Sequence, residues 1–539
     1  MAGFFPTSEN FPRFAVVGSD GKISCKMLIN IHAAKCVGIE AEPVSVEVNI
    51  GKGIGIHLVG LADAAVKESL LRTMTALQSM GFHIPGRKIV INLAPADIHK
   101  KGSGYDLPIA LGIIAASEQE KFPDLDRYLI MGELGLDASV RAVPGTLPFA
   151  ELAVKTGLRG CILPLRSAGG ADEFDGIEVY GVKDLEETLR ILRGEEDVED
   201  LLVRNRKGEA GPDADSPDSS PGVDFADIAG QEGARRGLEI AASGAHNVVM
   251  LGSPGCGKSS LAKALAGILP SMDRKEAMVV SKIYSVAGRG PESGLMRRRP
   301  FRSPHYSSSL AAMIGGGSGE NIMPGEVSLA QGGVLFVDEY LQMPKAVSEA
   351  LRAPLEDREV TISRLRAKVT YPASFMLVAA SNPCPCGYYG EGDRCTCTPS
   401  MRQNYLGRLS GPVLDRIDIQ LWLHSVEPSK IVRHVKSESS AEIAARVART
   451  RDIQRRRFAG EPVSTNAEMD SRMIRQYCPL SPDCEDVLEK VMTRQNLSAR
   501  AYSRIIKLAR TIADMEEAPD IDVRHIAEAV GYRFLDRIL

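Results

Sequence analysis

The chain has 539 residues and carries 65 Lys and Arg against 69 Asp and Glu, for a formal net charge of -4. Its length predicts about three domains. The charge balance excludes a protein that binds polyanions through its overall charge, although not one that binds nucleic acid through a local patch. The longest mostly apolar run, residues 107–116, contains Pro and Gly and is too short to cross a membrane, so we expect a soluble globular protein without a membrane partner.

The N-terminus and the cysteines both favour a cytoplasmic protein. The first residues, MAGFFPTSENFPRF, lack the basic segment and apolar core of a signal peptide. The ten cysteines are unevenly spaced and one lies within a Gly-rich loop, a usage that fits a reducing compartment better than a disulfide framework.

The N-terminal part alternates strand and helix patterns. Residues 44–51 and 88–95 alternate apolar and polar side chains, as half-buried strands do. Residues 64–80 have the apolar spacing of a helix, and residues 106–116 predict a second, buried helix. We therefore expect an α+β domain over residues 1–204.

A flexible linker is predicted at residues 205–222, NRKGEAGPDADSPDSSPG. It holds three prolines and no large apolar side chain, so it cannot bury enough surface to offset its ordering entropy. The part that follows opens with apolar strands separated by helices, which indicates a parallel sheet, and it ends in helices. We expect an α/β domain over residues 223–430 and a helical lid over residues 431–539.

A phosphate-binding loop is the strongest motif. Residues 252–259 read GSPGCGKS, between a predicted strand at 247–251 and a predicted helix at 260–269. The glycines let backbone N–H groups surround phosphates, the lysine reaches the β- and γ-phosphates, and the serine hydroxyl binds Mg²⁺. The predicted ligands of ATP and Mg²⁺ are Gly252, Ser253, Pro254, Gly255, Cys256, Gly257, Lys258, Ser259 and Ser260.

Two acids end the next apolar strand, since residues 332–339 read GGVLFVDE. A carboxylate at the end of a strand beside the phosphate loop can hold Mg²⁺, which is the role that we assign to Asp338. The next residue, Glu339, can orient and deprotonate the attacking water.

A third strand, residues 375–380, leads to Asn382, whose amide can contact the γ-phosphate or the water; a turn-forming Asn before Pro383 is the alternative. Three such strands predict an AAA+ ATPase, in which Asn382 takes the position called sensor 1.

In rings of this class an arginine of the neighbouring subunit stabilises the transferring phosphoryl group, and Arg416 fits that role. Arg500 precedes an apolar helical stripe and matches sensor 2, which reaches the γ-phosphate from the lid. Surface salt bridges are the alternative for both arginines.

Four cysteines follow Asn382 within fourteen residues: Cys384, Cys386, Cys395 and Cys397. Two C-x-C pairs around a Gly-rich loop can present four thiolates in the tetrahedral arrangement that zinc prefers. We expect a zinc knuckle at residues 384–397, with free thiols or a redox pair as the alternatives.

Three basic groups are candidates for DNA contact. The first is Arg297, Arg298 and Arg299, followed by Arg302. The second is Arg364, Arg366 and Lys368, which we expect to alternate along one face of a hairpin. The third is a helix with Arg449, Arg451 and Arg455–Arg457. The alternative for each group is a solvated face or intersubunit salt bridges, whereas sequence-independent phosphate binding would suit a motor.

These motifs together resemble the magnesium-chelatase-like AAA+ family, through stretches such as RPFRSPHYSSS, PGEVSLAQGGVLFVDE and LSGPVLDRIDI. The N-terminal stretches GIHLVGLADAAVKESLLR and INLAPADIHKKGSGYDLPIALGIIAAS resemble the Lon-protease-type, ribosomal-S5-like domain. The combined order is similar to that of the ComM/YifB branch. The resemblance implies a homo-hexamer whose hairpin before sensor 1 points into the ring pore, and a role in DNA branch migration during natural transformation.

The Lon-like domain departs from the protease pattern. Around Ser103 no serine falls cleanly at the position of the protease serine, and the segment expected to hold the activating lysine reads LPFAE at residues 147–151. Without that lysine a serine hydroxyl is not activated, so we expect a non-proteolytic domain.

We expect a ring-forming ATPase motor that acts on single-stranded or branched DNA, as a helicase does. A chelatase-type subunit that drives Mg²⁺ insertion into a porphyrin fits less well with the N-terminal domain and the C-x-C pairs. A protein-remodelling ATPase is the other alternative. Stimulation of ATP hydrolysis by DNA distinguishes the first function from the others, and porphyrin binding identifies the second.

Overall fold

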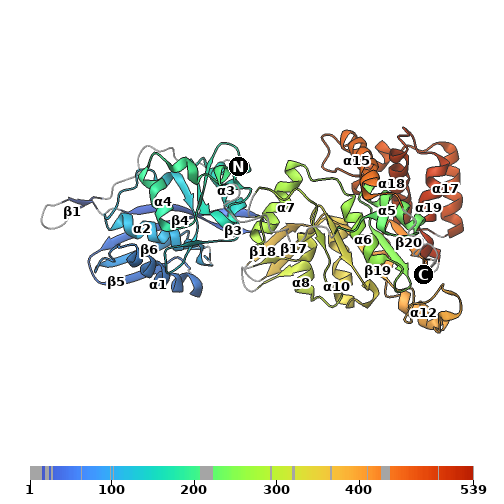
Figure 1. Cartoon of the computed structure of the whole chain (residues 1–539), viewed down its shortest axis with the longest axis horizontal. Helices are drawn as coiled ribbons and strands as arrows, with labels where there is room; N and C mark the ends of the chain where they lie inside the picture. Colours follow the sequence, from blue (N-terminus) through green and yellow to red (C-terminus); the bar gives the residue numbers. More distant parts are fainter. Residues whose placement is uncertain are drawn as a thin grey trace. The chain divides into compact units, whose positions relative to one another are not determined.

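A computed structural model describes residues 15–17, 23–25, 28–61, 63–97, 99–100, 102–206, 222–291, 294–317, 322–364, 367–409, 411–426, 437–495 and 497–537. The chain divides into two compact units, Met1–Ala214 with Ser281–Leu295, and Asp215–Val280 with Met296–Leu539 (Figure 1). None of the helices in the described ranges combines the length and the apolarity needed to span a bilayer.

The first unit is built on a seven-stranded mixed sheet in the order β11-β10-β7-β3-β4-β6-β5. The pairs β3–β4 and β4–β6 are antiparallel, and the other neighbours are parallel. The strands are β3 (Ile29–Val37), β4 (Glu40–Gly51), β5 (Gly55–Val59), β6 (Lys88–Ala94), β7 (Tyr128–Ile130), β10 (Gly160–Pro164) and β11 (Glu178–Val182). Two short hairpins are formed by β1 (Ala15–Val17) with β2 (Ile23–Cys25) and by β8 (Glu133–Leu134) with β9 (Val140–Arg141).

The helices of the first unit follow the sequence patterns closely. They are α1 (Ala64–Ser79), α2 (Asp106–Ala116), α3 (Thr146–Thr156) and α4 (Leu185–Arg193). Asp63 caps α1 by accepting a hydrogen bond of 2.9 Å from the Val66 N–H, which explains the sharp start of that helix. Helix α2 is buried on every side, as its continuous apolar sequence predicts. The four elements predicted in this unit are confirmed.

Two domain boundaries differ from the sequence prediction. Arg206 is buried, donates to the Gly181 carbonyl at 2.8 Å and pairs with Glu187, so the first unit reaches past residue 204. The rest of the predicted linker, residues 207–221, lies outside the described residues.

The other difference is that Ser281–Leu295, predicted as part of the ATPase domain, belongs to the first unit. Within that unit the Gly145 N–H donates to the Ser285 carbonyl at 2.9 Å, and Lys282 pairs with Glu151 at 2.7 Å. Composition does not reveal this grouping, because it depends on contacts between residues more than a hundred positions apart.

The second unit contains a five-stranded parallel sheet in the order β13-β16-β19-β12-β20. Its strands are β12 (Val248–Gly252), β13 (Phe301–Arg302), β16 (Val334–Val337), β19 (Met376–Ser381) and β20 (Ile419–Leu423). Two hairpins stand beside it, β14 (Gly315–Gly316) with β15 (Met323–Pro324) and β17 (Glu359–Arg364) with β18 (Ala367–Pro372). The predicted parallel sheet and the predicted hairpin before Asn382 are confirmed.

Helices follow and surround this sheet. The described helices of the unit are α5 (Glu232–Gly244), α6 (Lys258–Gly267), the start of α7 (Arg274–Val286), α8 (Leu310–Ile314), α9 (Glu326–Leu329), α10 (Lys345–Ala350), α11 (Arg352–Asp357), α12 (Pro399–Leu406), α13 (Gly411–Leu414), α15 (Ser440–Arg457), α16 (Ser471–Tyr477), α17 (Pro482–Gln495), α18 (Ala499–Met515) and α19 (Val523–Gly531). Helices α15 and α18 pack on α5, and one apolar core joins them to the sheet (Figure 1). The C-terminal helices therefore form one compact unit with the sheet.

A buried carboxylate ties these helices to the sheet. Asp418 is 1% exposed and accepts hydrogen bonds from the Asn247 N–H at 2.9 Å and from Arg504 at 3.1 Å. Burial alone would raise the pKa of Asp418, but the Arg504 guanidinium holds that pKa well below its usual range. Burial lowers the pKa of the neighbouring His246, so that ring is neutral at pH 7 and hydrogen-bonds Thr511 at 2.8 Å. Asp418 is thus the charged partner of Arg504.

Replacing Asp418 with Asn should destabilise the second unit by about 3–5 kcal/mol, because Arg504 would lose its buried partner. The control is Asp452→Asn, which breaks an i,i+3 pair with Arg455 in which the two side chains are 52% and 61% exposed. This control should cost less than about 1 kcal/mol. Guanidinium denaturation followed through the fluorescence of Trp422, the sole tryptophan, measures both effects. Equal shifts in the two variants would contradict the role of Asp418.

Candidate functional site

The phosphate loop lies between β12 and α6, at the carboxyl edge of the parallel sheet. Gly255 and Gly257 have φ angles of 80° and 93°, a region that glycine adopts without strain. Position 252 has no room for a side chain, because a Cβ there would lie 2.7 Å from the Leu423 carbonyl oxygen of β20. The sequence motif therefore has the strand, loop and helix context that phosphate binding needs.

Side chains from three neighbouring strands meet at this loop. Lys258 Nζ donates to the Gly252 carbonyl at 2.8 Å and to Asn382 Oδ1 at 3.2 Å. Ser259 Oγ donates to Asp338 Oδ2 at 2.9 Å. The parallel register brings the ends of β12, β16 and β19 to one edge, and so brings together four of the side chains predicted from sequence.

Glu339 follows Asp338 at a sharp turn. Its φ of 51° lies in the left-handed region, which costs energy for a residue with a Cβ and is frequent at functional sites. The Glu339 N–H donates to Asp338 Oδ1 at 2.9 Å, so the turn also fixes the first carboxylate. The two acids are thereby held at the edge that carries the phosphate loop.

A cavity of about 490 Å³ lies beside the loop and could accept a nucleoside. Gln231 connects the two, because its amide donates to the carbonyls of Cys256 at 3.1 Å and His424 at 2.7 Å. The cavity is lined by residues that include Gln231, Trp422, His424, Tyr532 and Phe534. Sequence reasoning missed these residues, because they come from three distant parts of the chain and share no motif.

Arg416 and Arg500 lie at the opposite, amino edge of the sheet. Arg416 is 6% exposed, donates to the Pro412 carbonyl at 2.6 Å and pairs with Glu356. Burial and the Arg500 guanidinium lower the pKa of Arg416. Arg500 is 57% exposed and lies 3.9 Å from Glu356 and 3.8 Å from Asp415. The structure thus brings the two arginines together.

These arginines are remote from the phosphate loop of their own chain. Arg416 precedes β20, whose first residue pairs with Val248 at the start of β12. The five residues of β12 separate that point from the phosphate loop by about 16 Å. Neither arginine makes a hydrogen bond or ion pair with Lys258, Asp338 or Asn382 in the described residues. The structure therefore does not bring the predicted sensor 2 residue to the phosphate loop of its own chain.

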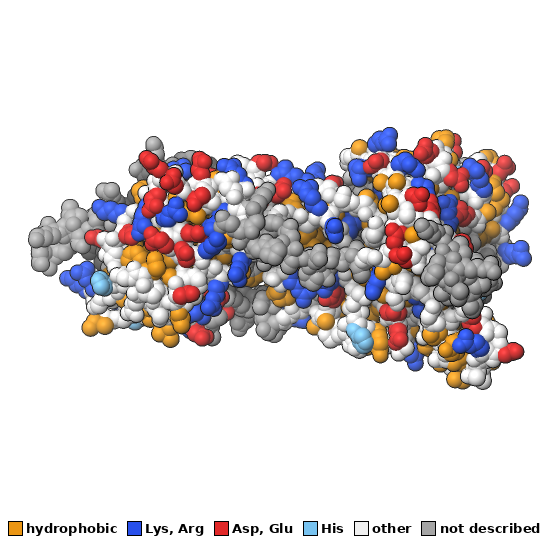
Figure 2. Space-filling model, in the orientation of Figure 1, with side chains coloured by type: hydrophobic (Ala, Val, Ile, Leu, Met, Phe, Trp, Pro, Cys, Tyr) orange, Lys and Arg blue, Asp and Glu red, His pale blue; other side chains and the backbone are white. Residues whose placement is uncertain are grey.

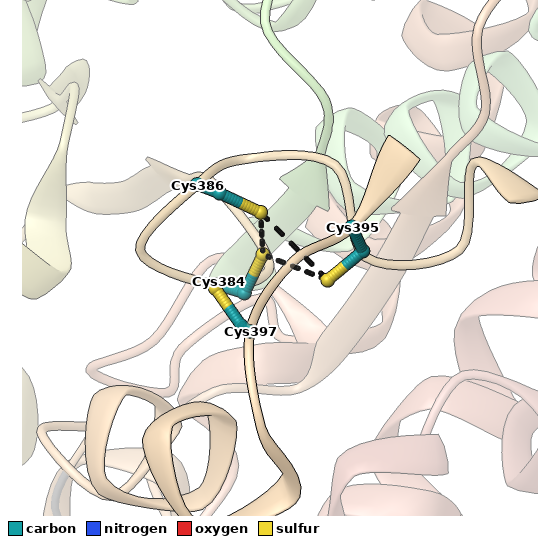
Figure 3. Close-up of side chains that lie close together, drawn as sticks. All are labelled: Cys384, Cys386, Cys395 and Cys397. Carbon is teal, nitrogen blue, oxygen red and sulfur yellow. Dashed lines mark hydrogen bonds between the residues drawn. The ribbon is translucent and has the colours of Figure 1, made fainter. Parts of the chain in front are cut away.

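The four cysteines converge on one point, as Figure 3 shows. All four sulfur atoms lie within 4.8 Å of one another. Cys384 Sγ lies 3.3 Å from Cys386 and 3.8 Å from Cys395, and Cys386 lies 3.7 Å from Cys395. A tetrahedral zinc site with Zn–S bonds of about 2.3 Å requires sulfur separations near ~3.8 Å, so the cluster fits that ion.

The thiols of this cluster differ in acidity. The Tyr388 N–H, which hydrogen-bonds the sulfur, lowers the pKa of Cys386 to about 6. Burial raises the pKa of Cys384 to about 12. One thiolate is therefore available at neutral pH to begin metal binding, and a bound cation would favour ionisation of the others.

The prediction that the basic residues of the hairpin lie along one face is wrong for Arg364 and Lys368. Arg364 pairs with Ala367 and Ser363 pairs with Lys368, so Arg364 and Lys368 point to opposite faces of the β17–β18 hairpin. The alternation is lost because the chain reverses between the two residues. Both side chains are exposed near the tip, and Arg366 lies outside the described residues.

The first basic group is divided between two roles. Arg299 donates to the carbonyls of Pro270 at 2.8 Å and Gly332 at 2.7 Å and pairs with Glu276 at 2.8 Å. Arg302 pairs with Glu326 at 2.7 Å. Both side chains therefore hold loops of their own unit, and their contact with DNA stays a prediction. Arg297 and Arg298 are exposed.

The basic helix α15 is also partly structural. Arg451 donates to the Ala242 carbonyl at 2.9 Å, and Arg457 pairs with the buried Asp514. Arg455 and Arg456 are exposed. On the face shown in Figure 2, basic and acidic side chains are interspersed, in agreement with the balanced composition. Any contact with nucleic acid therefore depends on small local groups.

In the first unit, Ser103 has an acidic neighbour. Its hydroxyl donates to Glu133, which lies 3.7 Å from Arg141. A carboxylate that is paired with an arginine is a poor base for activating a serine. The environment of Ser103 therefore differs from that of a lysine-activated nucleophile.

Comparison with known proteins agrees with this architecture. Three family models match the chain: "Magnesium chelatase, subunit ChlI" over residues 224–431, "Subunit ChlI of Mg-chelatase" over residues 46–167 and "Magnesium chelatase, subunit ChlI C-terminal" over residues 437–533. Together they cover both units.

Curated relatives match over almost the whole length. The chain is 40% identical to the uncharacterized protein YifB of Escherichia coli over 94% of this chain and 97% of that protein. It is 38% identical to the competence protein ComM of Haemophilus influenzae over 94% of this chain and 98% of that one. A partial match, 27% identical, covers 40% of this chain and 26% of the maternal DNA replication licensing factor mcm6 of Xenopus tropicalis. The chain therefore belongs to the magnesium-chelatase-like family of AAA+ ATPases, and within that family it is of the YifB/ComM type.

Proposed function

We propose that this protein is a ring-forming, ATP-hydrolysing motor that acts on single-stranded or branched DNA. The observation that carries the proposal is the meeting of Lys258, Ser259, Asp338 and Asn382 at one edge of the sheet. The family supports ATP hydrolysis. The similarity to mcm6, a DNA replication licensing factor, supports a DNA substrate, and the similarity to ComM, a competence protein, supports a role in competence. In this proposal the first unit, with its paired Ser103, is a non-proteolytic module.

The residues at the site divide the hydrolysis step between them. Lys258 binds the β- and γ-phosphates, while Ser259 and Asp338 would hold a Mg²⁺ ion, which would neutralise phosphate charge. Glu339 takes a proton from water as the water oxygen attacks the γ-phosphorus, and the bond from that phosphorus to the β-phosphate oxygen breaks. Asn382, fixed by Lys258, orients the γ-phosphate or the water. ADP and phosphate are the products.

Lys258→Ala and Glu339→Gln should separate binding from chemistry. Loss of the Lys258 contact should weaken ATP binding by ~10-fold or more, because a charged hydrogen bond contributes about 1.5–3 kcal/mol. Glu339→Gln should keep ATP binding and lower turnover by roughly 10²–10⁴-fold. Titration with a fluorescent ATP analogue and a phosphate-release assay measure the two effects, and equal loss of binding in both variants would contradict the assignment.

Assembly into a ring, which we propose to be a hexamer, would bring Arg416 and Arg500 to a neighbour's nucleotide. Their position at the amino edge, remote from the phosphate loop of the same chain, supports action between subunits. The 57% exposure of Arg500 and its long contacts leave it available to a neighbour. A guanidinium there would stabilise the charge on the transferring phosphoryl group.

Mixing inactive subunits tests this arrangement. Arg500→Ala subunits mixed with Lys258→Ala subunits should regain activity at roughly one interface in four of a randomly assembled cyclic ring. Glu339→Gln mixed with Lys258→Ala is the control, because both changes affect the same edge of a subunit and no interface becomes complete. Recovery is measured as ATP turnover, with assembly followed by light scattering. No recovery in the first mixture would show that Arg500 acts within its own chain or only in folding.

The exposed basic residues at the tip of the β17–β18 hairpin are the proposed DNA contacts, together with Arg297 and Arg298. An Arg364→Ala/Arg366→Ala/Lys368→Ala variant should keep basal ATP turnover, because the hairpin lies outside the nucleotide site. It should lose DNA stimulation, and the salt dependence of binding should become shallower by roughly 0.7–0.9 per lost contact.

The control for this variant is Arg472→Ala/Arg475→Ala/Arg494→Ala, which removes three exposed charges from α16 and α17. Binding to a four-way junction and to single-stranded DNA is measured at several salt concentrations. If both variants respond to DNA like the wild type, the hairpin does not bind DNA. If the wild type itself binds no DNA at low salt, protein remodelling becomes the better proposal.

We also propose that Cys384, Cys386, Cys395 and Cys397 hold a structural zinc ion, a role that the sulfur separations support. About one zinc ion per chain should co-purify with the protein. Elemental analysis of the wild type and of Cys384→Ser/Cys397→Ser measures it, with Cys36→Ser/Cys484→Ser as the control. Equal metal contents in all three proteins would contradict metal binding by the four cysteines.

A further inference from the structure

The four-cysteine loop is built directly onto the nucleotide site. It begins two residues after Asn382, which accepts a hydrogen bond from Lys258 at 3.2 Å. Glu391, within the same loop, accepts from Ser253 of the phosphate loop at 3.1 Å and from the Ser425 N–H at 2.9 Å. The hydrogen bonds of Ser425 and Ser253 lower the pKa of Glu391, so it is a charged acceptor at neutral pH.

Backbone packing adds to these hydrogen bonds. Gly387 has a φ of 86°, and a Cβ there would lie 3.0 Å from the ring of Pro254 in the phosphate loop. Gly390 has a φ of 92°, and a Cβ there would lie 3.1 Å from Trp422. The two glycines therefore allow the loop to rest against both the phosphate loop and the wall of the neighbouring cavity.

Trp422 extends this contact to the far side of the cavity. Its ring meets Tyr389 edge-on, with centroids 5.9 Å apart, and it meets Phe534 in the same way at 5.9 Å. Both Trp422 and Phe534 line the cavity beside Gln231. A displacement of the loop would thus alter the phosphate side and the cavity side of the nucleotide site together.

The backbone of the loop forms little regular structure. Between Cys384 and Cys397 the only regular element is a short 3-10 turn, Gly392–Arg394. Four cysteines whose sulfur atoms lie within 4.8 Å of one another can all ionise only when a cation neutralises their charge. A metal bound to all four would close the loop and restrict its conformations, as structural zinc sites do.

We propose that metal occupancy of the four-cysteine site controls nucleotide binding: the bound cation holds residues 384–397 against Ser253, Pro254 and Trp422, and loss of the cation releases both sides of the ATP site. The ligand is a borderline-soft divalent cation, Zn²⁺. This inference rests on the proposed ATP site and the proposed zinc site, and it adds that metal loss lowers affinity for ATP.

The experiment uses the full chain and two readouts besides turnover: the Kd for a fluorescent ATP analogue and the emission of Trp422. Cys384→Ser/Cys397→Ser should lose the metal, shift the Trp422 emission and bind nucleotide ~10-fold or more weakly, the scale on which supporting contacts of metal sites act. Cys36→Ser/Cys484→Ser should keep the metal, the emission and the Kd. Cys484 donates to the Ile521 carbonyl at 3.5 Å, a bond that a serine hydroxyl can also make.

A second variant separates the contact from the metal. Glu391→Ala keeps the four cysteines, so it should retain the metal and still bind nucleotide more weakly. Chelation of the wild type should reproduce the double-cysteine phenotype, and added Zn²⁺ should reverse it, which keeps the test valid if the double variant folds poorly.

The outcomes distinguish a failure of the coupling from a failure of the zinc site or of the ATP site. Loss of metal with an unchanged Kd, in the variant and after chelation, overturns the coupling and leaves the ATP and zinc proposals standing. A wild type without metal overturns the zinc proposal and the coupling with it. A wild type that binds metal but no nucleotide overturns the proposed ATP site.

Discussion

The buried ion pair between Asp418 and Arg504 is the interaction on which the nucleotide-binding unit depends. Asp418, just before the edge strand β20, accepts from the Asn247 N–H just before β12 and from Arg504 in α18, so it joins the amino ends of these two neighbouring strands to the C-terminal helices. A buried charge keeps its place only where its partner is also in place. The pair therefore anchors α18 to the amino edge of the sheet. Arg416, two residues before Asp418, and Arg500, one helical turn before Arg504, take their positions from it.

The parallel sheet then assigns different tasks to its two edges. Strands β12, β16 and β19 end together, so Lys258, Asp338 and Asn382 meet at the carboxyl edge. Arg416 and Arg500 are held at the amino edge. In the proposed ring, a single chain would therefore carry two incomplete halves of a catalytic site. Closure of a ring is a natural way for such a chain to complete one, because a head-to-tail interface brings unlike edges together.

Local sequence patterns predicted some parts of this structure and not others. The strand, loop and helix around residues 252–259 were predicted correctly, because each requirement for phosphate binding is local to the motif. The sequence did not predict that Ser281–Leu295 groups with the first unit, nor that Arg299 and Arg302 form ion pairs. An exposed and a paired arginine look alike in sequence, since the difference lies in a partner that another segment supplies. The reversal of direction at the β17–β18 turn likewise placed Arg364 and Lys368 on opposite faces.

The sequence by itself determined the chemistry of this protein: the phosphate loop, the Asp338–Glu339 pair, Asn382 and the cluster of cysteines, because spacing along the chain is sufficient to define each of them. Only the tertiary structure decided which of these groups act on one another. Gln231, Glu391, Trp422 and Phe534 belong to no motif, yet they link the cysteine loop, the phosphate loop and the adjoining cavity. The physical reason is that strand order and buried charge pairs, rather than local propensity, bring distant segments into contact.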